Sequence, residues 1–195
     1  NSVVIDRMKQ NFEFDFPPVQ FATLDPAFDH DNCVLHIGEY GQNRDDQVCI
    51  QNKKSFIIKT RVGRDCDPKD YQIAHQVMEI CNDNGVHPGD YIQDKTSNGR
   101  GVFAILQKEW SKDVNGVEFG GVSTERPIRA DSDDKACDLY VKFVDELWFR
   151  YAAWATEGLV GGLENLSSET EFDLGGRLYT LTSDKPERMT LETKK

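Results

Sequence analysis

The sequence predicts an α+β fold in which an antiparallel or mixed sheet of hairpin-joined strands packs against one long and one shorter helix. Apolar residues recur at three- and four-residue spacing over residues 131–158 and again over residues 67–84, as expected of amphipathic helices. Several shorter segments alternate apolar and polar residues, which is typical of strands with one buried face. Asn-Gly pairs, which favour tight turns, stand next to such segments. Helices beside hairpin-joined strands indicate the α+β class.

The N-terminal part of the chain is expected to be extended. Residues 1–10 predict a short strand or an anchoring arm. Residues 11–16 alternate strictly and are interpreted as a strand that ends at Pro17, because proline has no N–H to donate to a sheet. Residues 21–28 are interpreted as a loop. The apolar side of the predicted strand consists of Phe12, Phe14 and Phe16.

The middle of the chain predicts strands, then the shorter helix, then hairpins. The helix over residues 67–84 is well signalled, since Asp67 suits the cap and Pro68 suits the first helical position. Asn98-Gly99 predicts a hairpin turn that leads into a strand over residues 102–108. Asn115-Gly116 predicts the next turn. The β-branched and aromatic residues before the helix predict strands at 34–37, 48–50 and 56–62.

The segment over residues 131–158 is the longest periodic stretch of the chain and predicts a core helix that spans the domain. Acidic and serine side chains from Asp131 onward suit its first turn, and Gly158 suits its end. A final hairpin is predicted around residues 175–176. The aromatic residues on the long helix are candidates for contact with another subunit, because such anchors are typical of interfaces: Trp148, Phe149 and Trp154.

Length and composition indicate one domain over residues 1–182, followed by a polar tail over residues 183–195. The net charge of −11 argues against a general binder of phosphate backbones. Five scattered cysteines without a CxxC pair are interpreted as free thiols in a reducing compartment. No signal peptide and no uninterrupted apolar span is recognised, which excludes a membrane partner. The expected location is therefore a reducing intracellular compartment or an assembled particle.

One group of residues has the chemistry of a metal site. Carboxylates and an imidazole near the front of the chain suit Mg²⁺ or Mn²⁺, which prefer oxygen ligands. Two further aspartates before the shorter helix would complete the site if the fold brought them near. Such a site would serve a metal-dependent phosphodiesterase or nuclease. The candidate ligands are Asp25, Asp29, His30 and Asp31, with Asp65 and Asp67.

A zinc site is the weaker metal hypothesis. His30, Cys33, His36 and Cys49 have suitable side chains but no zinc-knuckle spacing. If residues 34–37 form a strand, Cys33 points away from His36, which argues against joint ligation.

A basic tract predicts a second possible activity. The chain has no acidic residue from Gln47 to Arg64, and lysines and arginines gather there and near the next predicted hairpin. With exposed aromatics, such a strand would suit a module that binds single-stranded nucleic acid. The residues concerned are Lys53, Lys54, Lys59, Arg61, Arg64, Lys95 and Arg100.

The favoured hypothesis is a non-catalytic binding or assembly protein, a structural subunit of a larger complex. G-x-S-x-G and phosphate-binding glycine loops are absent from the sequence, so an enzyme is not favoured and no cofactor is expected. The expected partners are other protein subunits or a second copy of the chain, through the two sets of aromatic residues named above. The nuclease with Mg²⁺ or Mn²⁺ and the nucleic-acid-binding module remain as alternatives.

Overall fold

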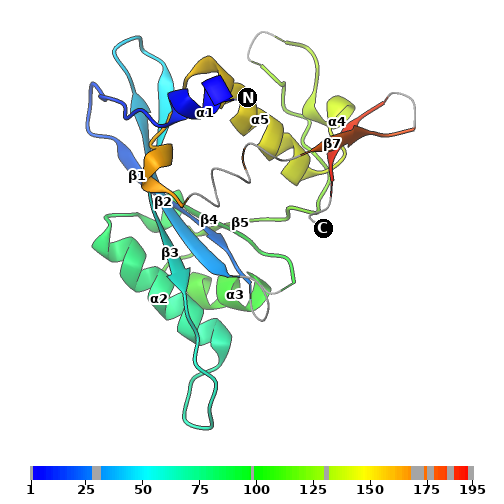
Figure 1. Ribbon diagram of the computed structural model, residues 1–195. Helices are drawn as coiled ribbons and strands as arrows, with labels where there is room; N and C mark the ends of the chain where they lie inside the picture. Colours follow the sequence, from blue (N-terminus) through cyan, green and yellow to red (C-terminus); the bar gives the residue numbers. More distant parts are fainter. Residues whose placement is uncertain are drawn as a thin grey trace.

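A mixed β-sheet organises the protein. The computed structural model describes residues 2–27, 32–97, 99–129, 132–167, 174, 178–183 and 187–192. Within these residues, six strands form the sheet in the order β5-β4-β1-β2-β3-β6. The strands β1, β2 and β3 are antiparallel neighbours, whereas β4 runs parallel to β1, β5 to β4 and β6 to β3 (Figure 1). Their bounds are Val19–Asp25 (β1), Cys33–Gln42 (β2), Val48–Ile58 (β3), Tyr91–Asp94 (β4), Asn115–Val117 (β5) and Val160–Gly161 (β6).

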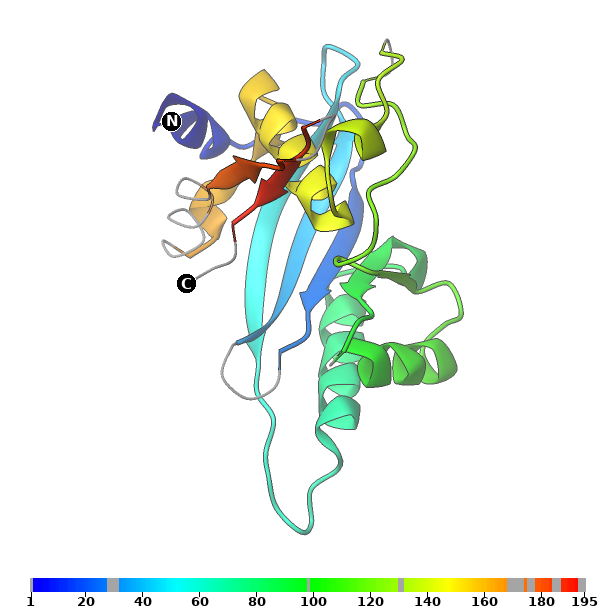
Figure 2. The same ribbon diagram turned by 90° about the vertical axis from the view of Figure 1, so that its right-hand side faces the viewer.

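Two helices cover one face of this sheet (Figure 2). They are α2, Lys69–Asp83, and α3, Gly99–Glu109. Their apolar residues pack on alternate residues of the strands, such as Leu24, Leu35 and Tyr91, which are buried. This is the main core. A short 3-10 helix η1, Pro88–Asp90, connects α2 to β4.

A second group of elements lies beside the N-terminal half of β3, where β6 pairs with Ile50 and Gln51 (Figures 1 and 2). Met8, Ala155, Val160 and Leu163 form its small buried core. A two-stranded sheet packs against α5, where the rings of Phe149 and Tyr179 meet edge to face with their centroids 5.3 Å apart. The elements are α1 Ser2–Met8, α4 Ala136–Leu139, α5 Phe143–Glu157, η2 Leu163–Asn165, β7 Tyr179–Leu181 and β8 Met189–Leu191.

The α+β class with a mixed sheet and helices is confirmed, and so is the shorter helix. The prediction of one long helix over residues 131–158 is wrong in part, because the chain is extended between α4 and α5. There Val141 donates its N–H to the carbonyl of Met189, and Lys142 donates its N–H to the Asp145 carboxylate at 2.9 Å. These N–H groups therefore do not join a helix, and Asp145 caps a new one from inside its first turn.

Two other segments differ from their predicted structure. Residues 102–108 belong to helix α3, not to a strand, because Val102, Ile105 and Leu106 all face the main core. A short apolar run fits either period, and packing decides between them. Residues 21–25 lie in the central strand β1, where a loop was predicted. This second error matters more, since β1 carries Asp25.

The predicted termini also differ from the structure. The segment at residues 2–8 is helix α1, and residues 11–16 form no strand; only Phe14 makes an isolated bridge, to Asn43. In place of an unstructured tail, residues 189–191 form β8, which pairs with β7. The predicted turn at residues 175–176 lies outside the described residues.

Candidate active site

Two carboxylates end neighbouring strands at the centre of the sheet. Asp25 is the last residue of β1 and Asp94 is the last residue of β4. The strands are parallel, and Leu24 pairs with Gln93, so the two aspartates follow in register. Since Leu24 and Gln93 are buried against α2 and α3, alternation directs both carboxylates to the opposite face. We call Asp25 and Asp94 the acid pair.

The position of the acid pair is the switch point of the sheet topology. From β1 the chain continues to β2 and β3 on one side, and later returns to form β4 and β5 on the other. Ligand sites in open sheets form at the carboxyl ends of strands where the connections diverge in this way. The general rule for such sheets therefore places a ligand site at the acid pair.

A buried network holds the end of β4 in place. The Tyr91 hydroxyl donates to Gln93 Oε1 at 2.8 Å, and Gln93 Nε2 donates to the carbonyl of Gly99 at 2.9 Å. Both side chains are almost completely buried. Gly99 begins α3 so close to β4 that a Cβ there would overlap the Asp94 carbonyl and touch Pro26. The network thus fixes the start of α3 against the Asp94 backbone and the Pro26 ring.

Thr96 orients the Asp94 side chain. Its backbone N–H donates to Asp94 Oδ1 at 3.0 Å, and its hydroxyl lies 2.8 Å from both carboxylate oxygens. A carboxylate has about four lone-pair directions, so acceptor capacity remains for a cation. Asp25, by contrast, is exposed.

The sheet face that bears the acid pair is half-exposed and carries a neutral histidine. His36 is the register partner of Thr23 on β1, two residues before Asp25 on the same face. Burial lowers the pKa of His36, and a contact of 3.1 Å between Nε2 and Asn52 Oδ1 offsets this only in part. Nδ1 lies 3.2 Å from the Ser55 hydroxyl. An imidazole held in this way stays neutral at physiological pH.

Of the metal ligands predicted from sequence, Asp25, Asp65 and Asp67 belong to the described residues, with Asp25 in β1 and the other two on a different segment. Asp29, His30 and Asp31 lie outside the described residues. Asp65 and Asp67 are exposed on the connection between β3 and α2. Within the part of the chain that the structure describes, no three His, Cys, Asp or Glu side chains gather at one point.

Among the described residues, the side chains named for a zinc site point to different faces of the sheet, which contradicts the zinc hypothesis. Cys33 is buried in the main core, while His36 lies on the other face of β2, as alternation required. Cys49 is also buried, and burial raises the pKa of the thiols of Cys33 and Cys49. All five cysteines are unpaired.

Asp94 is the member of the acid pair that sequence reasoning missed. The sequence predicts a turn just after it, at Asn98-Gly99, and assigns no chemical role to Asp94 itself. A usable signal existed: an aspartate directly after the apolar residues Tyr91 and Ile92, followed by a helix start. Recognising it required knowing that this strand lies beside β1.

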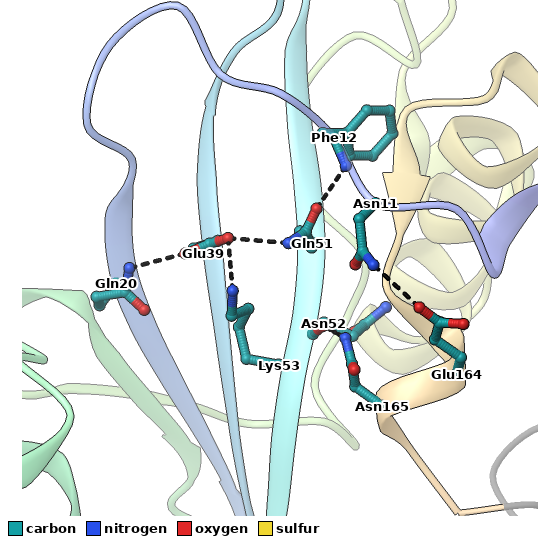
Figure 3. Close-up of polar contacts among 9 residues, drawn as sticks. All are labelled: Asn11, Phe12, Gln20, Glu39, Gln51, Asn52, Lys53, Glu164 and Asn165. Atoms are coloured by element: carbon teal, nitrogen blue, oxygen red, sulfur yellow. Dashed lines mark hydrogen bonds and ion pairs between the residues drawn. The ribbon is translucent and has the colours of Figure 1, made fainter.

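The buried carboxylates of the described residues are structural. Glu39 accepts hydrogen bonds from Gln20 and Gln51, both at 3.0 Å, and forms an ion pair with Lys53 at 3.1 Å (Figure 3). Glu146 accepts from the backbone and hydroxyl of Thr124 and from Arg150. Because these oxygens are already bonded and buried, Glu39 and Glu146 are not free to hold a ligand.

Asn52 and Gln51 continue this polar region toward the second group of elements. Gln51 Oε1 accepts a hydrogen bond from the backbone N–H of Phe12, and Asn165 donates to the carbonyl of Asn52 at 2.9 Å (Figure 3). Asn52 also donates to the carbonyl of Gly161 at 2.8 Å. These bonds fasten the N-terminal segment and η2 to β3.

The basic residues named from sequence fall into two sets. Some have partners: Lys53 pairs with Glu39, Lys54 lies 4.6 Å above the Phe56 ring, and Lys95 lies 3.9 Å from Glu118. The others are exposed beyond the end of β3 or at the start of α3: Lys59, Arg61, Arg64 and Arg100. Because β3 ends at Ile58, Lys59 and Arg61 do not share a strand face.

The aromatic residues predicted to contact another subunit lie largely within the chain. Phe149 stacks on Tyr140 at 5.2 Å, and Trp154 packs on the small core. Trp148 is half-buried. The rings of Phe12 and Phe14 lie 6.3 Å apart, whereas Phe16 is 71% exposed. Their role at an interface stays a prediction.

Comparison with known proteins identifies the fold. No family model and no curated protein sequence matches the chain. Solved structures do match, over nearly the whole length of the chain. The nuclease domain of the large terminase subunit gp2 of bacterial virus Sf6 superposes with a TM-score of 0.62 at 10% identity, covering 100% of this chain and 87% of that one.

Two structures of a K428A mutant of that domain also match. The one with calcium has a TM-score of 0.61 and the one with manganese 0.59, each at 10% identity over 99% of this chain and 87% of the other. At this identity the likeness establishes the fold alone.

These findings correct two expectations from sequence. The hypothesis of a non-catalytic structural subunit is wrong, since the structures that share this fold are nuclease domains. The expectation of no cofactor is wrong as well, since the matching domain was solved with manganese and with calcium. Among the described residues, no helix has the length and apolarity to cross a membrane.

Proposed function

We propose that this protein is a metal-dependent nuclease whose metal is held at the acid pair. The observation that carries the proposal is the register of Asp25 and Asp94 at the carboxyl ends of adjacent parallel strands. Two carboxylates on one sheet face, at a topological switch point, form a place where a cation and an anionic ligand can meet. The fold, shared with the nuclease domain of the large terminase subunit gp2 of bacterial virus Sf6, supports the same assignment.

The donor set fits Mg²⁺ or Mn²⁺. These ions prefer oxygen ligands, and Mg²⁺ is commonly held by one or two carboxylates together with waters and substrate phosphates. Asp25 and Asp94 supply the carboxylates, and Asp29, His30 and Asp31 remain candidates for further ligands. When bound, such an ion activates water and offsets the negative charge of the phosphate under attack.

Residues of the chain have defined roles in this proposal. Thr96 holds the Asp94 carboxylate in one orientation, and Gln93 fixes the backbone behind it. His36 stays neutral on the same face, so it adds no positive charge that would compete with a cation. The half-exposed sheet face leaves the acid pair open to a large substrate.

The proposed partner is nucleic acid, and the proposed setting is a larger assembly. The matching structures are domains of a large terminase subunit. By analogy, this chain would act beside other protein subunits, which retains the partner class expected from sequence.

Nicking of plasmid DNA with Mn²⁺ tests the proposal. Asp25→Asn and Asp94→Asn should each lower the rate about 100-fold or more, because losing a metal ligand removes several kcal/mol of transition-state stabilisation. Asp83→Asn, at the exposed C-terminal end of α2, is the matched control and should retain the wild-type rate. Wild-type activity in either acid-pair variant, with a preparation free of contaminating nuclease, would refute the assignment.

A further inference from the structure

The connection between β3 and α2 extends beyond the end of the sheet and carries exposed positive charge (Figures 1 and 2). We call residues 59–64 the cationic strap; its charged members are Lys59, Arg61 and Arg64. All three are exposed, and within the described residues none of them makes an ion pair. Lys53, Arg44 and Arg150, in contrast, are each paired with a carboxylate.

Two glutamines of α2 fix the backbone of the strap. Gln72 accepts a hydrogen bond from the N–H of Arg61 at 2.8 Å and donates to the carbonyls of Arg61 and Asp67 at 2.9 and 2.6 Å. Gln76 donates to the carbonyl of Lys59 at 3.0 Å. These bonds use backbone atoms of the strap, so the ammonium and guanidinium groups stay available.

The strap and the helix enclose an open pocket. Its volume is about 660 Å³, and it is lined by Lys59, Thr60, Arg61, Gln72 and Gln76. The lining contains two cations, a hydroxyl and two amides, but no carboxylate. Asp65 and Asp67 follow on the part of the connection that returns to α2. This lining is suited to an anion with several oxygens, such as a phosphate group.

The pocket lies at the same end of the sheet as the acid pair. Asp25 pairs with Val34, and Val34 pairs with Ile57, two residues before Lys59. With neighbouring strands about 4.8 Å apart, the backbone of Ile57 is about 10 Å from that of Asp25. Lys59 lies two residues further along the chain, so a nucleic-acid strand with a rise of about 3.4 Å per nucleotide would span the distance from the acid pair to the pocket in a few nucleotides.

We propose that the cationic strap binds the phosphodiester backbone of the nucleic-acid substrate a few nucleotides from the acid pair. The inference rests on the proposed nuclease function. Its physical reason is that a chain of net charge −11 repels a polyanion overall, so local cations must hold the substrate beside two carboxylates. Fixing the strap backbone in advance lowers the entropy that binding would otherwise cost.

Fluorescence anisotropy with a labelled DNA duplex and the matching single strand tests this proposal. Binding is measured in EDTA, so that metal-dependent cleavage does not interfere, over a range of NaCl concentrations. The double variant Lys59→Ala/Arg61→Ala should bind duplex at least about tenfold more weakly at about 0.1 M salt. Its slope of log K against log salt should fall by about 1.8, which is about 0.9 for each phosphate that the variant no longer neutralises. The single-strand arm should show a smaller fall of about 1.4.

Two further variants serve as comparisons. Lys108→Ala/Lys112→Ala removes the same charge from exposed positions at the far end of α3 and beyond it, and should leave the slope unchanged. Gln72→Ala loosens the strap without altering its charge, so affinity should fall while the slope stays near that of the wild type.

The outcomes separate the two proposals. Equal slopes for the strap variant and the Lys108/Lys112 variant would overturn the strap inference, even if the wild type cleaves DNA with Mn²⁺. A reduced slope together with a wild type that never cleaves would leave the strap as a nucleic-acid site and refute the nuclease assignment. Melting curves of both double variants check that the exposed substitutions leave the fold intact.

Discussion

Gln93 links the core of the protein to its candidate active site. Its side-chain oxygen accepts a hydrogen bond from the Tyr91 hydroxyl, and its side-chain nitrogen donates one to the carbonyl of Gly99. The Gln93 side chain is 1% exposed, so a group that loses either hydrogen bond cannot replace it with a bond to water. Because Asp94 is the next residue, displacement of Gln93 would move a ligand of the proposed metal.

We expect Gln93→Leu to lower stability by about 1–3 kcal/mol, since Tyr91 and Gly99 would lose their partner. It should also raise the Mn²⁺ concentration for half-maximal cleavage about tenfold or more, as changes behind metal ligands commonly do. Leu106→Ala, a core truncation in α3, serves as the control: it costs about 2–5 kcal/mol and should leave the Mn²⁺ dependence unchanged. An unaltered Mn²⁺ requirement in Gln93→Leu would limit Gln93 to a structural role.

His36 makes stability depend on pH. Burial lowers its pKa in the folded protein below the ordinary value of 6.5. As pH falls through 6.5 toward the lower folded-state pKa, the unfolded chain binds more protons than the folded one, so stability is lost; above 6.5 the effect is absent.

Urea unfolding at about pH 7.5 and about pH 5 checks the contribution of His36. The wild type should lose more stability between these values than His36→Gln, because glutamine does not titrate. Carboxylates affect both proteins equally and cancel in the comparison. An identical loss in the two proteins would show that His36 is protonated as easily when folded as when unfolded.

At the scale of elements, one carboxylate joins the start of α5 to the C-terminal hairpin. Asp145 accepts from the N–H of Lys142 at 2.9 Å and from the N–H of Leu191 at 3.0 Å, and it is 1% exposed. The first bond caps the helix, and the second holds β8. The same residue thus ends the extended segment after α4 and docks strands β7 and β8.

Asp145→Ala should therefore release the hairpin as well as shorten α5. We expect a loss of about 1–3 kcal/mol, because two partly buried N–H groups lose their acceptor. Hydrogen exchange should become faster at residues 189–191 while α2 stays protected. Glu157→Ala, at the exposed last residue of α5, is the control and should leave the hairpin protected. Unchanged exchange at Leu191 would contradict this role of Asp145.

The elements also show where local signals suffice and where they fail. Helix α2 follows from its own sequence: a proline before its first turn and an apolar stripe at helical spacing. Helix α3 does not, because its apolar run fits a strand equally well and becomes helical by packing three residues on the main core. The break before α5 involves the N–H of Val141, which donates to the carbonyl of Met189, far along the chain in β8.

At the scale of the whole molecule, the sheet concentrates opposite charges at one end. The acid pair lies at the C-terminal ends of β1 and β4, and the cationic strap follows the same end of β3, in a chain whose net charge is −11. A divalent cation at the acid pair would relieve repulsion between neighbouring carboxylates. Binding of the metal should therefore be visible in global stability.

Thermal unfolding with increasing Mn²⁺ tests this expectation. At about 100 times its dissociation constant, an ion bound only by the folded state adds about 2.7 kcal/mol, or about 5–10 °C in Tm for a chain of this size. Asp25→Asn/Asp94→Asn should show no such shift, and in EDTA should melt at the same or a slightly higher temperature than the wild type. An equal Mn²⁺ shift in both proteins would place the ion elsewhere.

The sequence by itself determined the α+β class, helix α2, the alternation that directs Cys33 and His36 to opposite faces, and the absence of acidic residues from Gln47 to Arg64. Each depends on neighbours within a turn or a strand. Tertiary structure decided the rest: that Asp25 ends a central strand, that Asp94 lies beside it, and that residues 131–158 do not form one helix. Strand order and parallel pairing bring together residues about seventy positions apart, and no local pattern encodes which strands become neighbours.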